Sequence, residues 1–157
     1  MKKQSIILVL LSLLLIGIFS SALADGTEEL GTPSIPIASG TGIVAAGTGM
    51  VSQPGSFDVS VPSGSTVKQV LLYWEGAMDS NSPGDDSIVI NGSNVSGTLI
   101  GGQTLFMPGT YDSSFRADIT NLGLVSAGSN TLTVDGLDFT DVSNGAGVLV
   151  IFDDGTG

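Results

Sequence analysis

The feature that most constrains the fold of this chain is a series of short apolar segments separated by turn-forming residues. In Phe57–Val61, three apolar residues alternate with polar ones, which is the two-residue period of a strand with one buried face. Thr131–Val134 repeats this period, and its β-branched residues favour a strand. After residue 24, no segment sustains the i, i+3, i+4 apolar period of an amphipathic helix, and Asp118–Val125 has room for one helical turn only. The pattern therefore predicts an all-β fold.

The number and spacing of these segments favour a particular all-β architecture. The longest, Val67–Ala77, is apolar on both faces, which is typical of a central strand buried on two sides. Asn91-Gly92 is a strong hairpin signal, because both residues tolerate a positive φ. About eight short strands with turns between them predict a jelly-roll β-sandwich. The expected strands are Ile43–Ala46, Phe57–Val61, Val67–Ala77, Ser87–Ile90, Val95–Phe106, Phe115–Ile119, Thr131–Val134 and Gly147–Phe152.

Residues 1–24 have the organisation of a signal-peptide helix. Two lysines precede the apolar run Ile6–Phe19, and Ala22-Leu23-Ala24 forms an A-x-A cleavage site before Asp25. An uncleaved anchor is the alternative, but the run is shorter than the roughly 20 residues that span a bilayer as a helix. No second long apolar run follows. We expect export through a cleaved signal peptide to the cell surface or extracellular space, with no membrane span in the mature chain.

Composition also changes along the chain. Residues 25–42 are rich in Gly, Thr, Pro and Ser and predict a flexible lead-in. Residues 43–157 hold all the expected strands and form the predicted β-sandwich domain. The last apolar segment, Val148–Phe152, is followed by only five polar residues and glycines. We favour a piece of a longer chain over a complete protein, because exported surface modules usually carry a further domain or anchor.

Charge and composition exclude several classes of function. The 157 residues include 4 basic and 15 acidic ones, with no His and no Cys. Ser-His-Asp triads, Cys nucleophiles and imidazole or thiolate zinc sites are therefore excluded. Once the signal is removed, Lys68 and Arg116 are the only cations, which argues against nucleic acid as a partner. A hydrolase using carboxylates alone is the remaining catalytic alternative, with Glu75 as its one nameable residue, and we expect no enzyme.

Three segments occur in the order found in one family of β-sandwiches. Val67–Gly76, Ser87–Gly92, and Asp118–Thr120 with Gly128–Val134 match its central strand, its hairpin and its "DiT..l..G.NtL.V" signature. Over about half of the mature chain, the sequence resembles galactose-binding-like jelly-roll modules, including those of bacterial and archaeal cell-surface proteins. In the latter, Gly145–Phe152 looks like the closing strand. The resemblance implies a jelly roll and a glycan or another surface protein as partner.

Two sets of side chains are candidates for ligand binding. Trp74 and Tyr111 could contact a sugar through their rings, with burial in the core as the favoured alternative for Trp74. The loop after the longest strand could supply oxygen ligands to Ca²⁺, with a solvated acidic turn as the favoured alternative. A second acidic group, at Asp135, Asp138 and Asp141, has the same two interpretations. The candidate calcium ligands are Asp79, Asn81, Asp85 and Asp86.

Together these observations predict an exported, non-catalytic module of a cell surface or matrix, with an adhesive or structural role. Its expected partners are other surface proteins or glycans. The alternative is a carbohydrate-binding module of a larger extracellular protein that acts on glycans.

Overall fold

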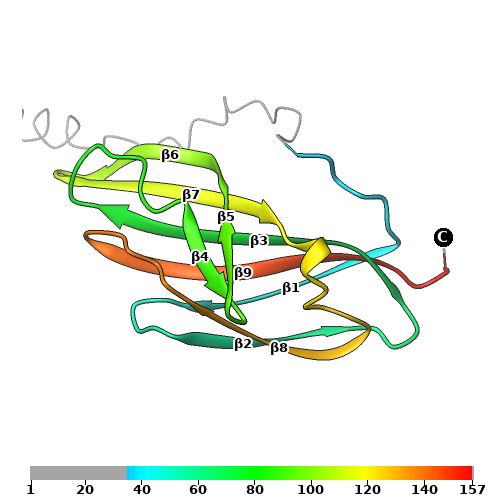
Figure 1. Cartoon of the computed structure of the whole chain (residues 1–157). Coiled ribbons are helices and arrows are strands. Elements are labelled where there is room, and N and C mark those ends of the chain that lie inside the picture. Colours follow the sequence, from blue (N-terminus) through cyan, green and yellow to red (C-terminus); the bar gives the residue numbers. More distant parts are fainter. Residues whose placement is uncertain (1–34, 157) are drawn as a thin grey trace, which may run out of the picture. The chain divides into compact units, whose positions relative to one another are not determined.

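The computed structural model describes residues 35–156, and all structural statements below refer to them. The predicted signal peptide and the first part of the predicted lead-in lie outside this range. The described chain forms nine strands in two antiparallel sheets that pack as a sandwich (Figure 1). The all-β prediction is confirmed, with one strand more than expected. Within the described range, no helix is long and apolar enough to cross a membrane.

The larger sheet has five strands and the smaller has four. The larger is ordered β1 (Gly42–Gly49), β9 (Val142–Asp153), β3 (Thr66–Met78), β7 (Thr110–Asp118) and β6 (Thr98–Met107). The smaller is ordered β2 (Gly55–Val61), β8 (Gly128–Asp135), β4 (Ser87–Ile90) and β5 (Ser93–Ser96). A short 3₁₀ turn, η1 (Thr120–Leu122), follows β7. Without β6, the two sheets are the four-on-four arrangement of a jelly roll, so β6 is an addition at one edge.

The core lies between the two sheets and is built from the alternating apolar residues of the strands. The rings of Trp74 and Phe115 stack at 5.8 Å between centroids. The Trp74 indole N–H donates a hydrogen bond of 2.9 Å to the carbonyl of Asp85, so its one polar atom is satisfied inside the fold. The largest fully buried side chains are Trp74, Phe115, Met50, Leu71, Leu72, Ile88, Ile90, Leu132, Val59, Val134 and Val150.

The segment expected to be one strand, Val95–Phe106, is two strands in different sheets. β5 ends at Ser96 in the smaller sheet, and β6 begins at Thr98 in the larger one. The chain crosses at Gly97, where a Cβ atom would collide with the ring of Trp74. Only glycine allows this close approach of backbone to the indole.

Residues 35–41 run beside the larger sheet. The buried amide of Gln69 accepts a hydrogen bond from the backbone of Ala38 (2.8 Å) and donates to the carbonyl of Pro36 (2.8 Å) and the carboxylate of Asp118 (2.7 Å). The backbone N–H of Thr41 donates to the carbonyl of Phe152. This end of the predicted lead-in is therefore attached to β3 and β9.

Candidate functional site

The edge strand β6 differs from every other strand of the sandwich. All ten of its residues are exposed, whereas each of the other strands has side chains that are at least half-buried. Phe106 is 67% exposed and Leu105 57% exposed. Such side chains are usually buried, and a group of them exposed on one strand is typical of an interaction site. The large exposed hydrophobic residues of β6 are Leu99, Ile100, Leu105, Phe106 and Met107.

The fold explains why these side chains stay exposed. Among residues 35–156, the smaller sheet has no fifth strand to lie opposite β6. Its nearest members, β4 and β5, have four residues each, about 13 Å of strand against about 33 Å for β6. Figure 1 shows β6 at the end of the larger sheet, with β2 and β8 on the opposite side of the molecule. The inner side of β6 therefore extends past the layer that would bury it.

Apolar side chains occur on both faces of β6. Its register with β7 places Leu99 opposite the core residue Phe115 and Leu105 opposite Tyr111, so these leucines are on the inner face. Ile100 and Met107 line hollows on the outer face. Strands with apolar side chains on both faces are usually buried on both faces. β6 has apolar side chains on both faces and is exposed.

The pairing of β6 with β7 is irregular. Its register shifts three times, between Leu99 and Gly101, between Gly102 and Thr104, and between Leu105 and Met107. Gly102 has a φ of 93°, and a Cβ there would collide with the carbonyl oxygen of Asp112. Bulges of this kind bend and twist an edge strand, but they add no charge to it.

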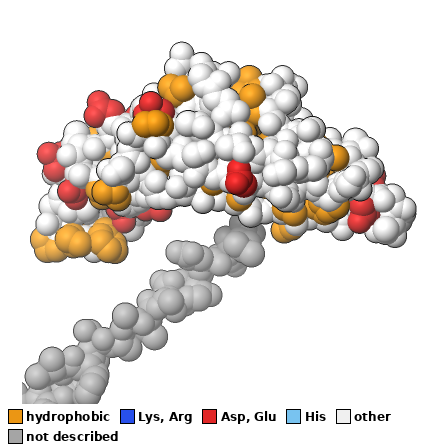
Figure 2. All heavy atoms as spheres, turned by 90° about the horizontal axis from the view of Figure 1, so that it is seen from below, with side chains coloured by type: hydrophobic (Ala, Val, Ile, Leu, Met, Phe, Trp, Pro, Cys, Tyr) orange, Lys and Arg blue, Asp and Glu red, His pale blue; other side chains and the backbone are white. Residues whose placement is uncertain are grey.

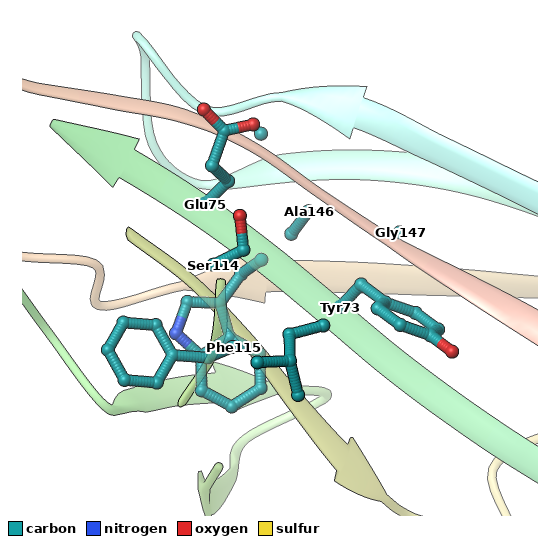
Figure 3. Close-up of a pocket in the computed structure, with 9 residues that line it drawn as sticks. Tyr73, Glu75, Ser114, Phe115, Ala146 and Gly147 are labelled. Atoms are coloured by element: carbon teal, nitrogen blue, oxygen red, sulfur yellow. The ribbon is translucent and has the colours of Figure 1, made fainter. Parts of the chain in front are cut away.

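An open hollow of about 370 Å³ lies on the outer face of the larger sheet, beside β6. Its floor contains Gly145 and Gly147 of β9, and its sides include Tyr73, Glu75 and Ser114. Figure 3 shows Glu75 next to Ser114, its register partner on β7, and Tyr73 at the other end. The hollow thus combines a phenol ring, a carboxylate and a hydroxyl with two glycines that add no side chain.

A second hollow, of about 280 Å³, continues from Glu75 toward the tip of the β6–β7 hairpin. Asn144 donates a hydrogen bond of 2.9 Å to Glu75, and Thr110 donates one of 3.2 Å to Asp141. Partial burial raises the pKa of Asp112, and the nearby charges of Glu75 and Asp141 raise it further. These carboxylates repel one another, but no group of three or more His, Cys, Asp or Glu residues in the described chain is placed to hold a metal ion.

The two residues predicted to contact a sugar occupy different environments. Trp74 is 2% exposed and stacked in the core, which favours the core alternative over the stacking one. Tyr111 is half-buried near the hairpin tip, opposite Met78 of β3 and Leu105 of β6. The structure therefore does not bring the two rings together at one exposed site.

The predicted calcium ligands make contacts within the protein. One carboxylate oxygen of Asp85 accepts hydrogen bonds from Ser87, and the other accepts the backbone N–H of Asp138 at 2.8 Å. Asp79 accepts a hydrogen bond of 2.8 Å from the Thr140 hydroxyl. Asn81 and Asp86 are exposed. The calcium site stays a prediction from sequence, while the contacts join the two acidic loops to each other.

The sequence pattern predicts β6 as the end of an ordinary strand, and it does not predict that the whole of β6 is exposed. The available signal was the charge pattern, because no charged residue occurs between Asp86 and Asp112 in a chain with a net charge of −11. Figure 2 shows acidic side chains at several places on one face and no basic side chain there. An uncharged, apolar strand on such a surface is a candidate contact site.

Comparisons with protein-family models, with curated proteins and with solved structures found no match to this chain.

Proposed function

We propose that this chain is an exported, non-catalytic module of a cell surface or extracellular matrix, with a structural or adhesive role, and that it contacts other proteins through β6. The observation that carries the proposal is the exposure of the whole uncharged strand, with its five large hydrophobic residues. Protein edge strands are normally guarded by charges, by β-bulges or by a covering segment. β6 has bulges only, which supports a role in contact with a partner.

The mode of contact follows from the position of β6. In the part of the chain that the structure describes, its one strand neighbour is β7, so its other side presents backbone donors and acceptors that an added strand can pair with. The apolar side chains on its two faces would lose water on the same approach, at about 25 cal/mol for each Å² buried. Backbone pairing and apolar burial therefore favour the same partner geometry.

The charge of the module supports the same class of partner. With 15 acidic and 4 basic residues, its surface repels nucleic acids and anionic lipid headgroups. The signal-like N-terminus supports export, and the absence of His and Cys from the sequence supports a non-catalytic role.

The test uses the full chain, tagged at its C-terminus, in the cells that naturally produce it. We expect the wild-type protein in the surface fraction and Phe106→Glu largely in the medium, because a buried carboxylate opposes contact through β6. Val51→Glu is the matched control, since Val51 is 78% exposed but lies between β1 and β2. Retention of the wild-type chain in the cytoplasm would overturn the proposal.

Glycan binding is the second candidate, and the outer-face hollow is the observation that favours it. A phenol ring can stack on a sugar, and carboxylate and hydroxyl groups can bond to its hydroxyls. Tyr73→Ala should then abolish retention on a polysaccharide array while the fold persists, with Val51→Ala, at an exposed position away from the hollow, as the control. Absence of retention on every glycan for the wild-type chain would remove this candidate.

A further inference from the structure

We propose that β6 pairs with β6 of a second copy of this chain, antiparallel and across a two-fold axis, so that the two larger sheets become one continuous sheet. This inference rests on the proposed function and names the partner of the same surface.

One side of β6 has no neighbouring strand among the described residues. β6 ends the five-stranded sheet, and within the described residues it pairs only with β7. A backbone N–H or C=O group that loses its water costs free energy unless it forms a hydrogen bond with another group. A long exposed edge is therefore a template for one more strand.

The charge distribution favours a second copy of this chain as the partner of β6. Two copies of a protein with a net charge of −11 repel each other wherever their acidic residues approach within about 8 Å, the screening length at physiological salt. β6 and the turn after it hold no charged residue. A cationic partner would be attracted to the acidic loops, whereas a second copy can approach closely only where charge is absent. The uncharged edge thus fits another copy of the same acidic protein.

The other edge strands of the sandwich, β1, β2 and β5, are less suited to such a contact. β2 carries Asp58 on an exposed position, and β5 has only four residues. β1 is also uncharged, but Ile43 is its one large exposed hydrophobic residue. β6 has five such residues over ten positions. It is the edge that would bury the most apolar area with its partner.

A contact between two copies of one strand can be symmetric. A two-fold axis perpendicular to the sheet keeps inner faces beside inner faces and makes the contact self-complementary. Leu99 and Leu105 of one copy would then lie on the same side as those of the other. Ile100 and Met107 would lie together on the opposite side. The pair closes on itself, so the product is a dimer and not a growing fibre.

The experiment measures the mass of the purified mature chain over a concentration series by sedimentation and light scattering. We expect a monomer–dimer equilibrium for the wild-type protein, and a dissociation constant at least about tenfold higher for Phe106→Glu, in which two carboxylates would enter one contact. Leu105→Glu is the second variant. Both positions are more than half exposed, so folding should be retained, as circular dichroism will check. Ile43→Glu, on the opposite edge, is the matched control and should leave the dimer unchanged.

Cross-linking gives an independent readout because the chain has no cysteine. Gln103→Cys lies in the middle of β6 and should form a disulfide-linked dimer under mild oxidation, whereas Ser60→Cys, exposed on β2, should not. Species larger than a dimer that are lost in Ile43→Glu would overturn the β6–β6 pairing in favour of β6 on β1. A monomer at every concentration would also overturn it. If Phe106→Glu nevertheless lost surface retention, the proposed function would stand with a different protein as partner.

Discussion

The two edges of the five-stranded sheet, β1 and β6, have the same lack of charge and opposite surroundings. β1 is the less apolar of the two, yet alternate side chains along it are half-buried, because β2 of the smaller sheet lies close to it. β6 is the more apolar, and none of its residues is buried. Burial in this sandwich therefore depends on the presence of an opposing strand and not on the hydrophobicity of the strand itself.

The sharpest test of this comparison pairs a core residue with an edge residue. We expect Trp74→Ala to lower the free energy of unfolding by about 3–5 kcal/mol, because it removes a stacked ring and leaves a cavity between the sheets. Phe106→Ala should change it by less than about 0.5 kcal/mol in the monomer, since its ring is mostly in water. Urea unfolding at low protein concentration measures both. Equal losses would contradict the view that β6 lies outside the core.

A smaller effect is expected at Gln69, where residues 36 and 38 attach to β3. Gln69→Ala should cost about 1–3 kcal/mol, because it leaves buried backbone groups and the Asp118 carboxylate without their partner. Burial tends to raise the pKa of Asp118, but hydrogen bonds from Gln69 and Thr120 outweigh it and lower the pKa.

That lowered pKa predicts a pH dependence. The stability contributed through Asp118 is present above its unfolded pKa and is lost as the pH falls through the folded one. The part of the Gln69→Ala deficit that involves Asp118 should therefore shrink in acid. Thermal unfolding of both proteins from pH 7 to pH 2 measures this change, and a deficit independent of pH would show that the carboxylate contributes nothing.

Hydrogen exchange compares the two edges directly and should show a moderate difference. In dilute protein, backbone amides of β6 should exchange faster than those of β1, because the β6–β7 ladder is irregular and no described strand of the smaller sheet covers β6. At high concentration, the outward amides of β6 should become protected if a second copy pairs with them. Mass spectrometry of peptides from residues 98–107 and 42–49 at two concentrations makes the measurement.

The smallest expected effect is at Asp112, near the hairpin tip. Its pKa is raised by burial and by the charges of Glu75 and Asp141, so the ionised form is disfavoured in the folded state. Stability held by the protonated form is complete below the unfolded pKa and is lost as the pH rises through the folded one. Asp112→Asn should therefore stabilise the protein slightly at pH 7, by less than about 0.5 kcal/mol, and not at pH 2. Differential scanning calorimetry at both pH values is the check, and a loss of stability at pH 7 would refute it.

Most strands of the sandwich could be predicted from the amino-acid sequence, because alternation and turn residues act within a few positions of the chain. Phe57–Val61 and Ser87–Ile90 were predicted and are β2 and β4 with nearly the same bounds. The sequence also determined the charge, which is a sum over residues and does not depend on their arrangement.

Which apolar residues are covered depends on contacts between strands that are distant in the sequence. Val95–Phe106 looks like one strand until Gly97 meets the Trp74 ring and the chain changes sheets. In the same way, Asp85 meets Asp138 and Asp79 meets Thr140 through contacts between distant parts of the chain. The exposure of Leu105 and Phe106 depends on a strand that the opposing sheet lacks. Such effects come from residues far apart in sequence, and no local pattern encodes them.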